Sequence, residues 1–242
     1  MRKSIAAALF AASAATAGCG QARSEDAGAT VSRTYQVGNF QEIEVAGPYD
    51  VQVRTGAKPS VAAEGGEKLL AKTKVVVENG KLRIGPEERR GFFNFGWSTR
   101  GSAKFVVTVP ELKGAAIAGS GDINIDRVKG DRFEGGVAGS GNLSVGAVEV
   151  QALKLGIAGS GGVKTGAGSA KSAEYEIAGS GDIDASAVNA DQAKASIAGS
   201  GNIRAHATGT ANVEIAGSGN VEISGGAKCS VEKQGSGEVT CS

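Results

Sequence analysis

Apolar and polar residues alternate along most of the chain beyond residue 34, and this period of two predicts β-strands. The alternation is clear in Phe40-Gln-Glu-Ile-Glu-Val45 and in Tyr49-Asp-Val-Gln-Val53. From Val75 to Ile84, two alternating runs flank Asn79-Gly80, which predicts a hairpin with a tight turn. Only Glu67 to Lys72 favours a short helical turn. Residues 34–113 are therefore expected to form a non-repetitive β region.

The second half of the chain repeats one short pattern. An apolar residue, Ala-Gly-Ser-Gly, a polar residue and a second apolar residue occupy Ile117 to Ile123, and this motif recurs down to a degenerate last copy at Lys233 to Val239. The first glycines of the copies stand at positions 119, 139, 159, 179, 199, 217 and 235, so the spacing is 20 residues four times and then 18 twice. A fixed period of this length marks a solenoid.

The alternation inside each repeat identifies the kind of solenoid. The repeats show no helical period of 3.6 and no leucine-rich ladder, and about 20 residues suit one β-helix turn of short strands and tight corners. The sequence predicts an all-β fold: a β-helix or β-solenoid of about seven turns over residues 114–242, preceded by the non-repetitive part. The two parts are expected to be continuous, so that 34–242 form one domain.

Stacked turns would align equivalent side chains in columns. The serines at 120, 140, 160, 180, 200, 218 and 236 would form a column of hydroxyl groups. The glycines beside them have two open roles, a corner that requires a positive φ or a close approach of two backbones. The next column reads Asp122, Asn142, Gly162, Asp182, Asn202, Asn220 and Glu238. A calcium row is one interpretation, but Asp122 and Asp182 would lie about 14 Å apart, so a structural stack is favoured.

The first 19 residues read as a signal peptide with two competing processing sites. Arg2 and Lys3 precede a short Ala-rich apolar run. Ala15-Thr-Ala17 suits ordinary cleavage and gives a plain secreted protein, whereas Thr16-Ala-Gly-Cys19 resembles a lipoprotein box that acylates Cys19. Lipidation is favoured because it leaves an even pair, Cys229 and Cys241, which is expected to form a disulfide in an oxidising compartment. Residues 20–33 are small and polar and are expected to form a flexible tether.

Composition excludes some classes of function. The chain carries 26 basic and 25 acidic residues, so it lacks the basic footprint of a nucleic-acid-binding protein. The single histidine, His206, makes a poor catalytic or zinc-site candidate. No catalytic residue, cofactor-binding residue or metal ligand is assigned, and no cofactor is expected. The alternative, an exported glycan-active β-helix enzyme, needs clustered carboxylates and aromatic platforms, and the repeats contain only Phe133 and Tyr175 as aromatic residues.

Aromatic residues gather instead in the non-repetitive part. Phe92, Phe93, Phe95 and Trp97 lie within six residues and are flanked by arginines. The segment has two interpretations: a loop that folds over the open end of the solenoid, or a contact loop for a partner.

These motifs together resemble the head GIN domain family, whose members are described as auto-transporter adhesins. The resemblance rests on the strands between Phe40 and Val53, Leu82-Arg-Ile84, Val109-Pro-Glu-Leu112, the Gly-Ser-Gly repeats and the closing Cys229 and Cys241, and it covers about residues 34 to 242. It implies a β-helical fold on an exported protein. Residues and resemblance together predict a non-enzymatic cell-envelope module, an adhesion or scaffold head that a lipid anchors in the outer membrane or periplasm. An envelope protein or a glycan is the expected partner. A third hypothesis is surface or ice binding through a face of small side chains.

Overall fold

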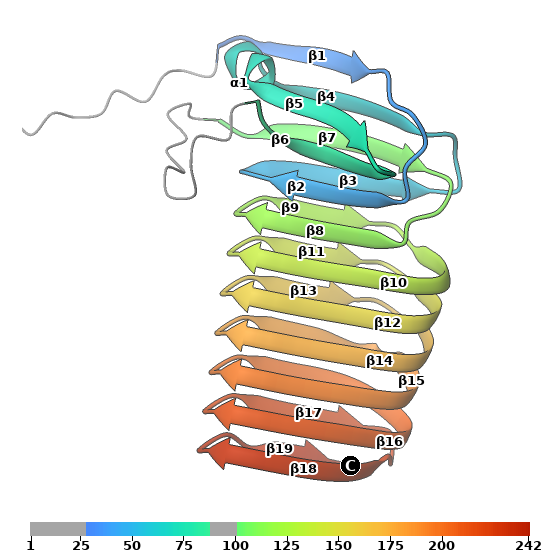
Figure 1. Ribbon diagram of the computed structural model, residues 1–242, viewed down its shortest axis with the longest axis vertical. Helices are drawn as coiled ribbons and strands as arrows, with labels where there is room; N and C mark the ends of the chain where they lie inside the picture. The colour runs from blue at the N-terminus through green and yellow to red at the C-terminus, as the bar shows by residue number, and fades with distance from the viewer. Residues whose placement is uncertain (1–27, 88–100) are drawn as a thin grey trace, which may run out of the picture.

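The computed structural model describes residues 28–87 and 101–242, which form a β-solenoid of about six turns (Figure 1). The all-β fold expected from the sequence is confirmed. About seven turns were expected, in agreement with this number. In Figure 1 the turns stack from the N-terminal end down to the C-terminus.

Two stacks of strands make up the walls of the solenoid, and strands β15 and β16 run through the bend between the walls and belong to both. In order along the first wall the strands are β1 (Thr30–Tyr35), β4 (Ser60–Gly66), β7 (Ala103–Val109), β3 (Tyr49–Thr55), β9 (Asp122–Ile125), β11 (Asn142–Val145), β13 (Gly162–Thr165), β15 (Asp182–Gly199), β16 (Asn202–Gly217), β17 (Asn220–Ser224) and β19 (Val239–Cys241). Along the second wall they are β5 (Thr73–Glu78), β6 (Lys81–Pro86), β2 (Glu42–Ala46), β8 (Gly114–Gly119), β10 (Val128–Gly139), β12 (Val148–Gly159), β14 (Gly168–Gly179), β15, β16 and β18 (Lys228–Gly235).

Equivalent residues of successive repeats pair directly across the parallel strands. Val137 pairs with Ile157, which pairs with Ile177, so each inward column is a row of stacked apolar side chains. These side chains are buried, and they form one continuous core between the walls. Large and small residues alternate between neighbouring columns. The large ring of Phe133 lies beside Gly135, where an added Cβ would come within 2.7 Å of Leu143. The core is therefore filled by side chains along its length.

The glycines of each corner have both of the roles that the sequence left open. The first glycine has a positive φ, +132° at Gly159 and +135° at Gly179, which favours glycine. The second glycine, such as Gly161, faces the interior, where a Cβ would overlap the carbonyl oxygen of Gly141 in the preceding turn. The serine between them is exposed, and its backbone N–H donates to the glycine carbonyl of the turn before, as from Ser160 to Gly139 at 2.9 Å.

A degenerate corner extends this stack into the non-repetitive part. Gly47, between β2 and β3, has a φ of 127° and accepts a hydrogen bond from the backbone N–H of Gly121 at 3.0 Å. Ala46-Gly47-Pro48 therefore takes the place of Ala-Gly-Ser one turn earlier. The same stacking places β3 of the non-repetitive part directly beside β9 of the repeats.

Antiparallel strands cover the N-terminal end of the solenoid. β4 pairs with β7 and β1 pairs with β4, while β5 and β6 form the expected hairpin, with Asn79 and Gly80 at positive φ. The expected helical turn is α1 (Glu67–Ala71), and the hydroxyl of Thr73 joins it to the core by bonding to Tyr49 Oη at 2.9 Å and to the carbonyl of Leu69 at 2.8 Å. β1 begins at Thr30, inside the range assigned to the tether, because Thr30 to Tyr35 pair with β4 from Gly66 to Val61.

Candidate functional site

An open groove of about 500 Å³ crosses five strands of the second wall, from β10 to β16. Two outward rows of side chains line it, one running from Arg132 through Ser172 to Thr210 and the other from Glu134 to Asn212. Between them the buried Leu153, Ala173 and Ala193 contribute apolar surface. At the interstrand spacing the groove extends about 19 Å along the solenoid axis.

The groove exists because each turn bends at the same place. In β10, Asp131 and Arg132 are both exposed in succession, and the pairing with β12 passes from Gly130 to Arg132 without Asp131. Two consecutive outward residues interrupt the alternation of inward and outward side chains. The same interruption recurs at the polar pairs Lys171-Ser172 and Asp191-Gln192. This interruption was the sequence signal for the groove, and the sequence reasoning missed it.

Charges of opposite sign alternate down the second row. Lys154 Nζ lies 3.2 Å from Glu174 Oε2 and 3.1 Å from Glu176 Oε2, and Lys194 Nζ lies 3.8 Å from Glu214 Oε1. The hydrogen bonds to Glu176 and Glu174 raise the pKa of Lys154 above its ordinary value. The groove therefore presents mutually paired charges along one row, whereas the other row begins at Arg132 and continues with the uncharged Ala152, Ser172, Gln192 and Thr210.

The column after Gly-Ser-Gly is a hydrogen-bonded stack. Asn142 donates to Asp122 Oδ1 from its side-chain amide at 2.9 Å, Asn202 donates in the same way to Asp182 at 2.7 Å, and Asn220 donates to Asn202 at 3.0 Å. This is the structural stack favoured from the sequence, because the oxygens that calcium would need already accept hydrogen bonds within the column. Among the described residues, no group of three or more His, Cys, Asp or Glu side chains is placed to hold a metal ion.

His206 is tied to its neighbouring turn. Its Nδ1 lies 3.0 Å from the hydroxyl of Ser224, and that hydroxyl donates to the carbonyl of Ala205 at 3.4 Å. The contact joins neighbouring turns and stabilises the stacking of β16 on β17.

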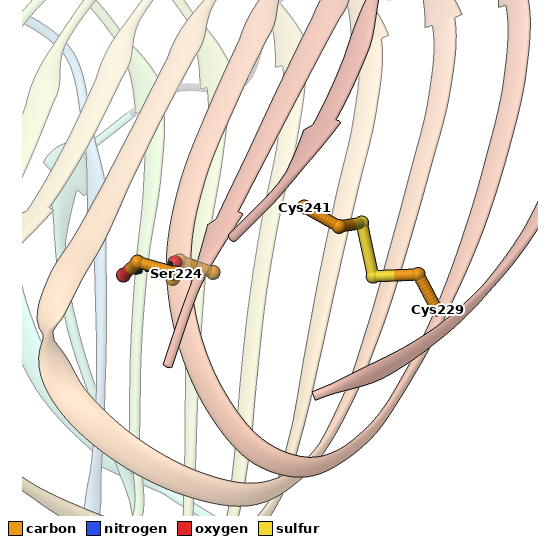
Figure 2. The surroundings of a disulfide bond; sticks show 4 residues. Ser224, Cys229 and Cys241 are labelled. Carbon is orange, nitrogen blue, oxygen red and sulfur yellow. Dashed lines mark hydrogen bonds between the residues drawn. A yellow bond between two sulfur atoms is a disulfide. The ribbon is translucent and has the colours of Figure 1, made fainter. Parts of the chain in front are cut away.

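The predicted disulfide closes the C-terminal end of the solenoid. Cys229 in β18 and Cys241 in β19 are joined, with their Cα atoms 6.6 Å apart, and Figure 2 shows the bond spanning the space between the two strands. Cys229 pairs with Ala211 and Cys241 with Ile223, so the cysteines replace apolar core residues in two facing columns. In the same turn Lys233 replaces the inward Ile215, and its Nζ donates to the carbonyl of Gly237 at 2.9 Å.

Two of the candidate sites lie outside the described residues. These are the lipidation site Cys19 and the aromatic segment Phe92, Phe93, Phe95 and Trp97. Both stay predictions from the sequence. In the described part of the chain, no helix has the length and apolar character needed to cross a membrane.

The fold and the groove define a class of protein: an elongated β-solenoid that presents ordered rows of side chains on its outer walls. Residues 39–227 match the family described as "Putative auto-transporter adhesin, head GIN domain". The chain belongs to this family, as its motifs predicted.

Solved structures share the architecture over nearly the whole chain. A "putative adhesin" from Bacteroides fragilis superposes with a TM-score of 0.81 at 24% identity, covering 90% of this chain and 100% of that one. A "putative lipid binding protein" from Parabacteroides distasonis gives a TM-score of 0.69 at 26% identity, covering 90% of this chain and 99% of that one. The comparison with curated proteins gave no match. These likenesses, with the family match, fit an adhesin-like, non-enzymatic module of the cell surface or envelope.

Proposed function

We propose that this chain is a non-enzymatic adhesion head that a lipid on Cys19 attaches to the cell envelope, and that the groove of the second wall binds an envelope glycan or protein. The observation that carries the proposal is the groove itself, a surface about five strands long in which polar and apolar positions repeat at every turn. An elongated partner can contact such a surface at several equivalent places.

The charges of the groove suit binding better than catalysis. Lys154 and Lys194 form ion pairs with carboxylates of neighbouring turns, and these pairs restrict the lysine side chains before a partner binds. Restricted side chains lose less entropy on binding. A glycan-active site typically needs two carboxyl groups that flank the scissile bond, and here the carboxylates of Glu174 and Glu176 both face one lysine, Lys154.

The orientation of the solenoid relative to its N-terminus also suits a binding module that projects from a membrane. Residue 30, where the described N-terminal part enters its first strand, lies at the covered end, and the repeats extend away from it toward the C-terminus (Figure 1). A lipid on Cys19 would place the covered end toward the membrane and the groove on the part that projects.

Filling the groove tests this function. Ser172 is exposed and lies in the middle of the first row, where Ala152 and Gln192 are its neighbours on the adjacent strands. We expect Ser172→Trp to reduce binding of the purified chain to envelope fractions by about tenfold or more, since the indole would occupy the space of the partner.

The matched control is Ser169→Trp in the same strand. Ser169 is also exposed but lies outside the groove, so this variant is expected to bind as the unmodified chain does. If both variants bind envelope fractions as the unmodified chain does, the groove is not the binding site.

A further inference from the structure

The C-terminal end of the solenoid leaves a strand edge open. β18 pairs with β16 on one side, and among the described residues no strand pairs with its other side. Val231 stands in an inward column, but the residue is 46% exposed because no further turn among the described residues covers it. An open edge with an exposed apolar residue is a template for one more strand.

The charges of this edge differ from those of the ion-paired positions in the stack. At those positions successive turns alternate in sign, as in Lys154 and Glu174 or Arg204 and Glu222. In the last turn Glu232 pairs directly with Glu214, and like charges in this position repel each other. Among the described residues, Glu232 has no basic partner within ion-pair distance, so a basic group on the open side would be stabilising.

The strand itself carries such a basic group at a symmetric position. Lys228 and Glu232 both lie two residues from Ser230, and all three are exposed. If a second copy of β18 ran antiparallel with Ser230 facing Ser230, each Lys228 would face a Glu232 of the other copy. Val231 would then face Cys229, whose disulfide provides apolar surface.

We infer that the chain pairs with a second copy of itself tip to tip, through antiparallel contact of the two β18 strands. The N-terminal end is built differently, from the antiparallel strands β1 and β5 and from α1, so the self-complementary positions of β18 have their match at a second C-terminal tip. A two-fold axis therefore joins the two C-terminal ends and closes the assembly at two copies.

Tip-to-tip pairing extends the proposed adhesion function. The pairing itself is argued from β18, and only its role in joining two membranes rests on the proposed function. Two heads anchored at their N-terminal ends on facing membranes would meet at their C-terminal tips. A contact of one edge strand is small, so it is weak in solution and gains strength when many copies on each surface pair at once. The partner is another copy of this chain, whereas the groove binds a different molecule.

Charge reversal with complementation tests the pairing on the full-length chain. Concentrations up to about 1 mM cover the weak affinity expected of a small contact. Sedimentation and small-angle X-ray scattering should show the unmodified chain forming dimers with about twice the longest dimension of the monomer, because the two solenoids join end to end.

Each single reversal should abolish the dimer. Lys228→Glu places two acidic groups opposite two acidic groups, and Glu232→Lys places basic groups opposite basic groups. An equimolar mixture of the two variants should form a heterodimer, because both facing pairs are again of opposite charge. Lys171→Glu makes the same charge change at an exposed site away from the tip, and this control should dimerise as the unmodified chain does.

Three results would each overturn the inference. They are an unmodified chain that stays monomeric at the highest concentration, a Lys228→Glu variant that still dimerises, and a variant mixture that stays monomeric while the unmodified chain dimerises. Binding of the same variants to envelope fractions separates this inference from the groove. If the unmodified chain binds those fractions normally and forms no dimer, tip pairing fails alone. If dimers form but envelope fractions are not bound, the groove fails alone.

Discussion

At the scale of single residues, the glycine columns hold the turns at their close spacing. Gly161 faces the interior, and an added Cβ would overlap the carbonyl oxygen of Gly141 and come within 2.7 Å of Val137. We expect Gly161→Ala to lower the free energy of unfolding by about 1 to 3 kcal/mol, because the backbone of the preceding turn must move. Urea unfolding measures the change.

Gly156 provides the control for that substitution. A Cβ there would meet no atom within 4 Å, and its φ is outside the left-handed region. Gly156→Ala is therefore expected to leave stability unchanged or to raise it by about 0.4 to 1 kcal/mol, since alanine restricts the unfolded chain. A similar loss of stability in both variants would show that close approach is not the reason for the glycine columns.

Tyr175 is a buried residue whose polar atom has no evident role. Its side chain is fully buried, and its hydroxyl has no hydrogen-bond partner among the described residues. We expect Tyr175→Phe to be neutral or stabilising by up to about 1 kcal/mol near pH 7, because it removes a buried polar group that lacks a partner.

The same substitution should change the response to alkaline conditions. Burial raises the pKa of Tyr175 above its ordinary value of 10.0. Above that value the unfolded chain releases the phenol proton while the folded chain keeps it, so the unmodified protein loses stability as the pH rises. Tyr175→Phe should lose less between about pH 10 and pH 11. Urea unfolding at several pH values would contradict this if the two proteins fell in parallel.

At the scale of elements, the last turn is held by the disulfide and the Lys233 contact rather than by a following turn. We expect the double variant Cys229→Ala, Cys241→Ala to lose about 3 kcal/mol, because the closed loop no longer restricts the unfolded chain. The variant should lose stability against local opening of β18 and β19 as well as against global unfolding, since these strands lie at the end of the stack.

Hydrogen exchange distinguishes the two effects. Amides of β18 and β19 should lose protection first in the double variant, while those of β12 and β14 keep theirs until global unfolding. Uniform loss of protection along the solenoid would mean that the disulfide does not act as an end closure.

The elements also show how far a sequence of this kind can be interpreted. The repeats, the hairpin at Asn79-Gly80 and the helical turn near Glu67 were predictable, because each depends on a local pattern. The corner at Gly47 was not recognised, since Pro48 stands where the other corners have serine. β1 was assigned to the tether because its pairing with β4 is a long-range contact.

The candidate site was less predictable than the fold for a related reason. The groove depends on a bend that repeats at Asp131-Arg132 and its equivalents, and a bend is visible only as a break in alternation. Which rows of side chains then face each other across the groove depends on the stacking of five strands. The disulfide was predictable from the count of cysteines. The repulsion between charges at the tip was not, because it depends on the pairing of Glu232 with Glu214.

At the scale of the whole molecule, the account requires that the head be held at one end. The solenoid has a covered N-terminal end and an open C-terminal tip, so attachment through Cys19 would orient the groove and the tip away from the membrane. Without attachment the same head would bind its partner in solution and could not join a cell to a surface.

Cys19→Ser tests that claim most directly, because it removes the acylation site and leaves Ala15-Thr-Ala17 for export. The measurement is the adhesion of cells that produce the full-length chain to a surface coated with envelope fractions, with the location of the chain followed in the same cells. We expect the unmodified chain to remain with the membrane and to support adhesion, whereas the Cys19→Ser chain is found in the soluble exported fraction and adhesion is lost. Adhesion of the Cys19→Ser cells at the unmodified level, or membrane retention of the Cys19→Ser chain, would contradict the account.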